Sequence, residues 1–204
     1  MQRIYRRQKK FYLHNRISRI FKTILTDKII IKQTVSWIKK VVVECNFCPF
    51  AAKALLKKSI RYAVLPSANL KNSLATFYNE LKFLDGKADL ETTFIIIPNN
   101  FKNFNSYLSL VEKVEELISK ENYTGIYQVA SFHPKYCFDG STNSDAANYT
   151  NRSPYPMLHI LREESITKAL SAFPHPEKIP ERNINYAREK GLKYMQLLRV
   201  ACLD

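Results

Sequence analysis

Short apolar stretches alternate with longer amphipathic segments along most of this chain. The clearest stretch is residues 92–97 (TTFIII), which ends at Pro98 and has the continuous apolar character of a buried strand. Helical periodicity precedes and follows it, over residues 69–84 and 104–121. The other predicted strands are residues 59–65, 125–131 and 157–162. Strands that alternate with helices favour an α/β fold, and we expect a single mixed sheet of about four strands covered by helices.

Helices are also expected at both ends of this pattern. Residues 33–44 and 50–58 are predicted to be helical before the first strand. Two more helices are predicted after the last strand, near residues 163–172 and 180–199. The fourth strand follows a long loop rather than a helix, so it could pair antiparallel to its neighbours.

The positive charge of the chain is concentrated at its N-terminus. The 204 residues include 32 Lys and Arg against 18 Asp and Glu, a net charge of +14. Residues 1–32 hold ten of the basic residues and one acid, so they contribute +9. Apolar residues recur there at helical spacing, as Leu13, Ile17, Ile20, Phe21 and Ile24. We therefore expect a basic helical N-terminal extension, residues 1–32, in front of a single α/β domain, residues 33–204.

Three interpretations of this extension remain open. An Arg-rich, acid-poor amphipathic segment is typical of a mitochondrial import signal, which would place the protein in the matrix or at the matrix face of the inner membrane. A basic arm could instead dock on other protein subunits, on RNA or on anionic lipid. The third interpretation is a solvated tail, with a cytoplasmic location as the alternative. No stretch approaches 18 uncharged apolar residues, so no transmembrane segment is predicted.

The scarcity of glycine excludes several common nucleotide-binding loops. The four glycines are isolated from one another, at Gly86, Gly125, Gly140 and Gly191. The GxGxxG dinucleotide loop and the Walker A loop both need clustered glycines, because the backbone must approach phosphate closely. A GxSxG nucleophile elbow and an HExxH metal motif are also missing from the sequence.

Polar residues gather between the third and fourth predicted strands. The loop over residues 132–156 has little periodic pattern, and loops of this length in a compact domain are often functional. In an enzyme, His133 would act as a base or proton shuttle and Arg152 would bind an anion or oxyanion. The predicted substrate-binding residues are Asn148, Asn151, Ser153 and His159. His159, on the predicted fourth strand, could equally be a core histidine.

The first two of the four cysteines form a Cys45-x-x-Cys48 pair followed by Pro49. A helix start at this proline would lower the pKa of the Cys48 thiol, which suits a redox pair or a catalytic nucleophile. A structural zinc site is the alternative to catalysis, and its predicted ligands are Cys45, Cys48, His133 and Cys137. Cysteines are also common as small buried apolar residues, so zinc is one of several interpretations and no cofactor is assigned.

Three motifs are specific enough to indicate a family. They are NFCPFA at residues 46–51, QVASFHP at residues 128–134 and ANYTNRSPYP at residues 147–156. Together they resemble a mainly bacterial family catalogued as domain of unknown function 1415, over about residues 33–195. The resemblance implies Cys48 as a motif residue but neither Cys45 nor Cys137, and it implies no particular activity.

Two functions from different classes follow from these observations. The chain could be an accessory subunit of a larger mitochondrial assembly, such as a respiratory complex or ribosome, attached through residues 1–32. Alternatively, it could be a small-molecule enzyme that uses Cys48 and His133 as a thiol–base pair beside an Arg/Asn anion-binding loop. A thiol-dependent hydrolase, transferase or redox enzyme would fit that description. The basic extension favours the subunit, built on an enzyme-like domain, and this is the function that we expect. The polar loop favours the enzyme, which is the alternative.

Overall fold

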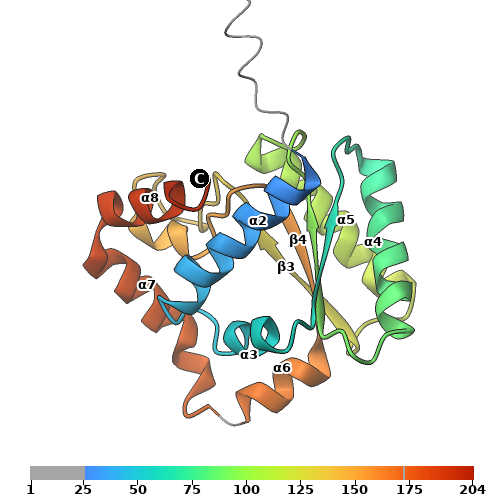
Figure 1. The fold of residues 1–204 in the computed structure, drawn as a ribbon. Helices are drawn as coiled ribbons and strands as arrows, with labels where there is room; N and C mark the ends of the chain where they lie inside the picture. The colour runs from blue at the N-terminus through green and yellow to red at the C-terminus, as the bar shows by residue number, and fades with distance from the viewer. Residues whose placement is uncertain (1–25, 172) are drawn as a thin grey trace, which may run out of the picture.

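The computed structural model describes residues 26–171 and 173–204 and begins with a helix, α2, spanning Asp27–Trp37 (Figure 1). The Thr26 side chain caps this helix by accepting a hydrogen bond from the Ile29 N–H. The helix continues into a π-helical segment, η1, over Ile38–Val43. The helix predicted over residues 33–44 therefore starts six residues earlier, at Asp27. The helical spacing predicted within residues 1–25 lies outside the described residues.

A single mixed sheet of four strands forms the centre of the fold, in the order β1-β2-β4-β3. β1 (Ile60–Val64) runs parallel to β2 (Thr92–Ile96). β4 (Met157–Arg162) runs antiparallel to both of its neighbours, β2 and β3 (Tyr127–Phe132). The predicted α/β class with one mixed sheet is confirmed, and so is the antiparallel pairing of the fourth strand.

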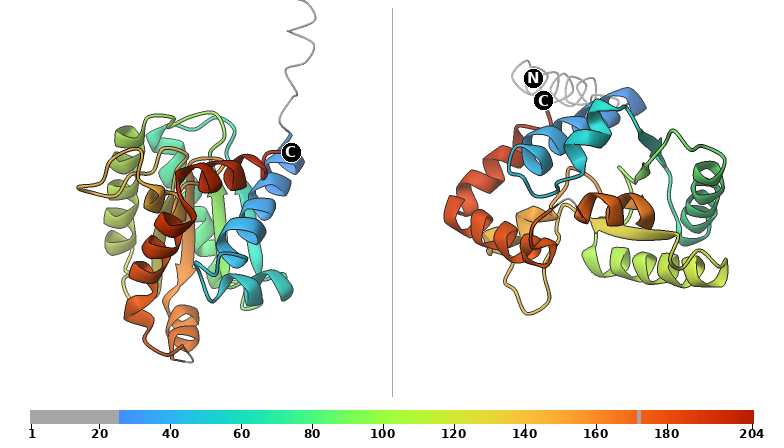
Figure 2. Two further views of the ribbon diagram at one scale, coloured as in Figure 1. Left: turned by 90° about the vertical axis from the view of Figure 1, so that its left-hand side faces the viewer. Right: turned by 90° about the horizontal axis from the view of Figure 1, so that it is seen from below.

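Helices α4 (Leu70–Asp85) and α5 (Phe104–Lys120) cover one face of the sheet (Figures 1 and 2). Each begins at an asparagine cap, because Asn69 accepts from the Asn72 N–H and Asn103 from the Ser106 N–H. Their apolar sides meet residues of β2 and β4 that point the same way. The buried side chains of this cluster include Phe77, Leu81, Ile95, Ile97, Tyr107, Val114, Leu158 and Ile160.

The opposite face of the sheet packs against the N-terminal and C-terminal helices (Figure 2). α2 and η1 lie on this side, followed by the short helix α3 (Ala51–Leu56). Trp37, fully buried on α2, packs edge-on against Phe132 of β3, with ring centroids 5.1 Å apart. Because strand side chains alternate between faces, Phe94 and His159 belong to this side, while Ile95 and Leu158 belong to the other.

The last part of the chain folds into α6 (Glu163–Leu170), the short segment η3 (Pro176–Lys178), α7 (Ile179–Lys190) and α8 (Leu192–Val200). The single helix predicted near residues 180–199 is therefore wrong in one respect, because it divides at Gly191. This glycine has a φ of 83°, a conformation that an L side chain rarely adopts. Among the described helices, none is long and apolar enough to cross a membrane.

Candidate functional site

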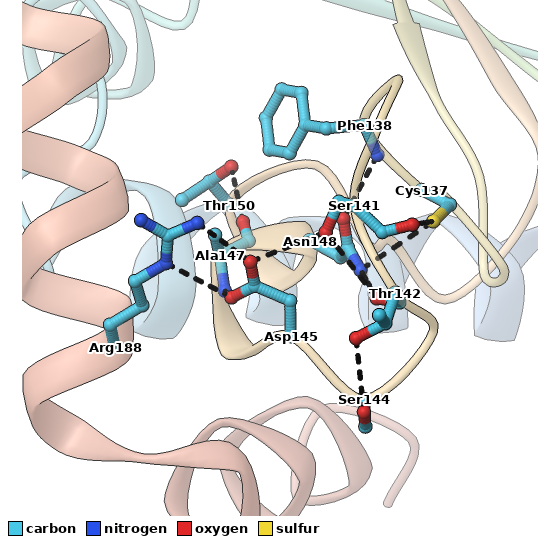
Figure 3. Close-up of polar contacts among 10 residues, drawn as sticks. All are labelled: Cys137, Phe138, Ser141, Thr142, Ser144, Asp145, Ala147, Asn148, Thr150 and Arg188. Carbon is cyan, nitrogen blue, oxygen red and sulfur yellow. Dashed lines mark hydrogen bonds and ion pairs between the residues drawn. The ribbon is translucent and has the colours of Figure 1, made fainter.

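The loop between β3 and β4 is organised by its own polar side chains (Figure 3). Asn148, on the short helix η2 (Ala146–Thr150), accepts a hydrogen bond from the Phe138 N–H at 2.9 Å. Its amide nitrogen donates to the Thr142 carbonyl at 2.8 Å. Asn148 is fully buried and uses both ends of its amide within the loop. The predicted substrate-binding asparagine therefore holds two turns of the loop together.

A second contact in Figure 3 fixes the loop to α7. Asp145 caps η2 by accepting from the Ala147 N–H, and it forms an ion pair with Arg188 at 2.7 Å. The Arg188 hydrogen bonds, helped by the Ala147 N–H, lower the pKa of Asp145 to about 2. A carboxylate held in this way stays ionised and is not available as a general acid near neutral pH.

Arg152 is only 8% exposed, and its guanidinium binds backbone carbonyls. Its Nε donates to the Tyr136 carbonyl at 2.8 Å and its Nη2 donates to the Asn143 carbonyl at 3.1 Å. The guanidinium carbon lies 4.8 Å from the centre of the Tyr149 ring, over its face. Arg152, predicted to bind an anion, therefore has its planar fork occupied by the loop itself.

The remaining predicted loop residues also have internal partners. The Asn151 carbonyl accepts from the His133 N–H, and its side-chain oxygen accepts from the Thr150 hydroxyl. The Ser153 hydroxyl donates to the Tyr155 carbonyl. Neither Asn151 nor Ser153 is among the residues that line the cavity beside Cys48 and His159.

Both ring nitrogens of the buried His133 are engaged. Its Nε2 lies 2.9 Å from the Phe101 carbonyl, which can only accept, so Nε2 carries the hydrogen. Its Nδ1 accepts from the Lys135 N–H at 2.9 Å. Burial lowers the pKa of His133, which keeps the ring neutral. The ring therefore has no free lone pair with which to bind zinc or to accept a proton from Cys48.

The cysteines are separate, free thiols in this structure. Cys45 is buried near the Lys40 carbonyl, while the Cys137 thiol donates to the Ser141 carbonyl at 3.4 Å. Within residues 26–171 and 173–204, no three His, Cys, Asp or Glu side chains are grouped so as to hold a metal ion. The structure thus gives no support to the predicted zinc site.

Burial raises the pKa of the Cys48 thiol, although the Phe50 and Ala51 N–H groups oppose this. The lowered pKa expected from a helix start is not observed. The physical reason is that desolvation of the thiolate outweighs the two backbone hydrogen bonds. Cys48 is therefore a protonated thiol at neutral pH.

Two of the predicted residues, Cys48 and His159, line the same cavity, whose volume is about 620 Å³. Its floor is the sheet face that carries His159, and its walls come from α2, η1, the Cys48–Phe50 segment, α3 and α6. Aromatic and aliphatic side chains dominate the lining, including Trp37, Val42, Phe50, Phe94, Phe132 and Leu161. A largely apolar cavity with a few polar groups is typical of a small-molecule site.

The cavity floor includes part of a row of side chains that crosses all four strands. Tyr62 pairs with Phe94, Phe94 with His159, and His159 with Ala130. The imidazole of His159 stacks on the Phe94 ring with centroids 3.7 Å apart and planes 9° apart. Ala130, on the other side of the imidazole, has only a methyl group, which leaves room beside the ring.

Hydrogen bonding fixes the tautomer of His159. The Thr92 hydroxyl donates its one hydrogen to the Ile160 carbonyl and lies 2.6 Å from the His159 Nε2. It must therefore accept from Nε2–H, which leaves the lone pair on Nδ1. No described residue hydrogen-bonds to this Nδ1. The atom is not completely enclosed by the described residues either, so it is accessible to a ligand. Burial lowers the pKa of His159 to about 3, so the ring is neutral at pH 7.

Charged side chains surround the cavity, and one of its lysines has no partner among the described residues. Lys57 is paired with Glu91 at 3.4 Å, and Lys168 is paired with Glu164. Lys53, exposed on α3, has no ion pair or hydrogen bond from its ammonium group to any described residue. Lys53, Thr92 and Ala130 are not predicted from the sequence. The alternation of side chains along TTFIII and MLHILR indicates which residues share a face of the sheet. Only the register between the two strands places Thr92 beside His159.

Comparison with known proteins identifies the family but no characterised relative. Residues 29–197 match a family described as protein of unknown function (DUF1415). The search of curated proteins gave no significant match, and neither did the search of solved structures. The match covers most of the 204 residues and includes the three motifs that resemble this family. The chain therefore belongs to the DUF1415 family of proteins of unknown function.

Proposed function

We propose that this protein is a small-molecule enzyme in which His159 accepts a hydrogen bond or proton from a ligand in the 620 Å³ cavity. One observation carries the proposal, namely that the Nδ1 lone pair of a neutral histidine at the wall of that cavity has no hydrogen-bond partner among residues 26–171 and 173–204. Histidines with a structural role usually have both nitrogens engaged, as His133 has. Within the part of the chain that the structure describes, His159 has a partner at Nε2 and none at Nδ1, so Nδ1 is left for a ligand.

Cys48 lines a different wall of the same cavity and supports the same proposal. It belongs to the segment before α3, whereas His159 belongs to the sheet, so a ligand that fills the cavity would contact both. The thiol is protonated at neutral pH because burial raises its pKa. Its role in a reaction would be that of a proton donor, or of a nucleophile once its proton has been transferred. The predicted thiol–base enzyme is thus retained with His159 in place of His133.

The low pKa of His159 belongs to the ligand-free protein and reflects desolvation. A negative charge brought next to the ring by a ligand would stabilise the imidazolium and raise that pKa toward the range of a general base. We therefore expect the imidazole to accept a hydrogen bond from neutral ligands, and to accept a proton when the bound ligand is anionic.

The substitution H159Q tests this role directly. Glutamine can place its amide N–H near the position of Nε2 and keep the Thr92 contact, but it has no basic nitrogen at the Nδ1 position. A panel of small organic acids, esters and amides would be screened for thermal stabilisation of the wild-type protein, and each hit assayed for conversion by mass spectrometry.

The expected result is a hit that wild type converts and H159Q does not. H175Q is the matched control, because His175 is exposed and lies outside the cavity. Equal conversion by wild type and H159Q would refute the role of His159. Loss of conversion in H175Q as well would point to a general effect on the protein.

We also propose, as a second function, an accessory subunit of a mitochondrial assembly such as a respiratory complex or ribosome. The supporting observation is the charge of residues 1–32, which carry +9 of the net +14. Matrix import and attachment to protein subunits, RNA or anionic lipid would all use that charge. The test compares the full chain with a variant in which the arginines among residues 1–25 are glutamine. Import into isolated mitochondria and co-migration with a large complex should both fall, and unchanged import and migration would refute the proposal.

A further inference from the structure

We infer that the cavity beside His159 binds a small planar organic acid, with its ring over Ala130 and its carboxylate at Lys53. This inference rests on the proposed function, because it names the substrate class of the same site. The aromatic side chains of the cavity floor and the charges around the cavity support it.

The shape of the floor favours a flat ligand. The imidazole of His159 stacks on Phe94 at an angle of 9°, and Phe94 in turn stacks on Tyr62 at an angle of 11°. The three rings form a face-to-face stack across β1, β2 and β4, and the imidazole is the last ring of that stack. At Ala130 the row loses its ring, although this residue is the direct partner of His159 on β3. A planar ligand over Ala130 would extend the row across the last strand.

Aromatic side chains also border this position. Phe132 follows Ala130 by two residues on the same face of β3, and its ring lies 6.0 Å from the imidazole of His159. Trp37 packs edge-on against Phe132 and lines the cavity as well. Aromatic rings favour stacked and edge-on contacts with other rings, so these neighbours suit an aromatic or conjugated ligand. A volume of about 620 Å³ is large enough for a bicyclic ring.

The charges around the cavity favour an acid. Four cationic side chains contribute to its lining, against two carboxylates. The carboxylates of Glu91 and Glu164 already pair with Lys57 and Lys168. The Arg162 guanidinium donates to the Leu84, Lys87 and Leu90 carbonyls and to the Tyr127 hydroxyl. Lys53 is the cation of this set without a partner among the described residues, so a ligand carboxylate would complete it.

The test uses 2-naphthoic acid, which combines a flat bicyclic ring with one carboxylate, and its uncharged analogue 2-naphthamide. Isothermal titration calorimetry would measure both against the full-length wild type and the variants K53A, K53E, A130L and H159Q. K71A is the matched control, because Lys71 is exposed on α4 and lies outside the cavity. Circular dichroism and thermal unfolding would establish that each variant is folded.

We expect wild type to bind the acid more tightly than the amide. K53A should weaken binding of the acid by about two- to five-fold, the range of a solvent-exposed ion pair, and leave the amide unaffected. K53E should remove the preference for the acid. A130L should weaken both ligands about tenfold or more, because the added methylenes fill the space proposed for the ring. K71A should behave like wild type.

The outcomes separate this inference from the proposed function. Retained binding of the acid by H159Q, together with loss of the acid preference in K53E and weaker binding of both ligands in A130L, would support the inference whatever the role of His159 in proton transfer. Failure of the acid to bind, or equal affinities for acid and amide in wild type, would overturn the inference. In that case the conversion assay with H159Q would still decide the proposed function.

Discussion

The Nε2 of His159 lies 2.6 Å from the Thr92 hydroxyl, on the neighbouring strand of the sheet. Because the same hydroxyl donates to the Ile160 carbonyl, the contact orients the imidazole and selects its tautomer. A threonine at the start of β2 thus determines which nitrogen of a β4 histidine is available to the cavity. The stack on Phe94 holds the plane of the same ring.

The titration of His159 gives a first prediction, which concerns stability in acid. Burial lowers the pKa of His159 to about 3 in the folded protein, while the unfolded chain titrates near the ordinary value of about 6.5. Between pH 3 and pH 6.5 the unfolded chain binds a proton that the folded protein does not bind. The stability that the neutral His159 contributes is therefore complete above pH 6.5 and is lost as the pH falls toward 3. Wild type should therefore lose more stability than H159Q between pH 7 and pH 4.5.

Urea unfolding of wild type, H159Q and the exposed-site control H175Q at the two pH values would measure the difference. The loss attributable to His159 is at most about 1.4 kcal/mol per pH unit. Parallel losses in wild type and H159Q would show that the ring titrates normally in the folded protein.

A second prediction concerns the amide of Asn148. The variant N148D keeps the shape of the side chain but replaces the donor to the Thr142 carbonyl with a carboxylate oxygen in a fully buried position. We expect a loss of about 2–4 kcal/mol in the free energy of unfolding, from an unpaired carbonyl and a buried charge. N143D is the control, because Asn143 is exposed on the same loop.

Urea unfolding and 2-naphthoate affinity, measured together, would distinguish a structural role from a ligand-binding one. The structural role predicts that N148D lowers stability while the remaining folded protein binds 2-naphthoate as wild type does. A stable N148D protein with weakened binding would instead return Asn148 to the ligand site.

The fold was largely predictable because its signals are local. The apolar run TTFIII corresponds to β2 within one residue, and the periodicity over residues 104–121 corresponds to α5. The start of α2 was missed although Thr26, a good cap, precedes it, because Asp27 and Lys28 were grouped with the basic extension. The division between α7 and α8 depends on the backbone angle of Gly191, and one isolated glycine in a helical pattern does not reveal that angle.

The site was harder to predict because it depends on contacts between distant residues. Arg152 and Asn148 have the side chains of a ligand loop, but composition does not show that backbone carbonyls already occupy them. Cys48 and His159 were both named, yet their shared cavity depends on the packing of α3 and α6 against the sheet. The partner of His159, Thr92, is 67 residues away in the sequence, so only the register of β2 and β4 could identify it.

A third prediction concerns Arg162, which connects β4 to the end of α4. Its guanidinium donates to the Leu84 carbonyl at the end of α4 and to the Lys87 and Leu90 carbonyls that follow. R162A removes all these donors, and we expect a loss of about 2–4 kcal/mol in the free energy of unfolding. R162K keeps the charge but not the planar fork, so it should recover only part of the loss. Equal stability of R162K and wild type in urea would show that the charge alone matters.

The last prediction concerns the reactivity of Cys48. Burial raises the pKa of its thiol, and alkylating reagents attack the thiolate, so iodoacetamide should modify Cys48 more slowly at pH 7 than it modifies free cysteine. The rate should rise about tenfold per pH unit while the pH remains below the pKa. Peptide mapping by mass spectrometry would give the rates at Cys48 and at Cys137, a partly exposed thiol outside the cavity.

Saturating 2-naphthoate should slow alkylation of Cys48 and leave that of Cys137 unchanged, because the ligand would fill the cavity that the Cys48 thiol lines. Rapid alkylation of Cys48 at pH 7 would contradict the raised pKa, and equal protection of both cysteines would indicate a general stabilisation of the protein rather than occupancy of the cavity.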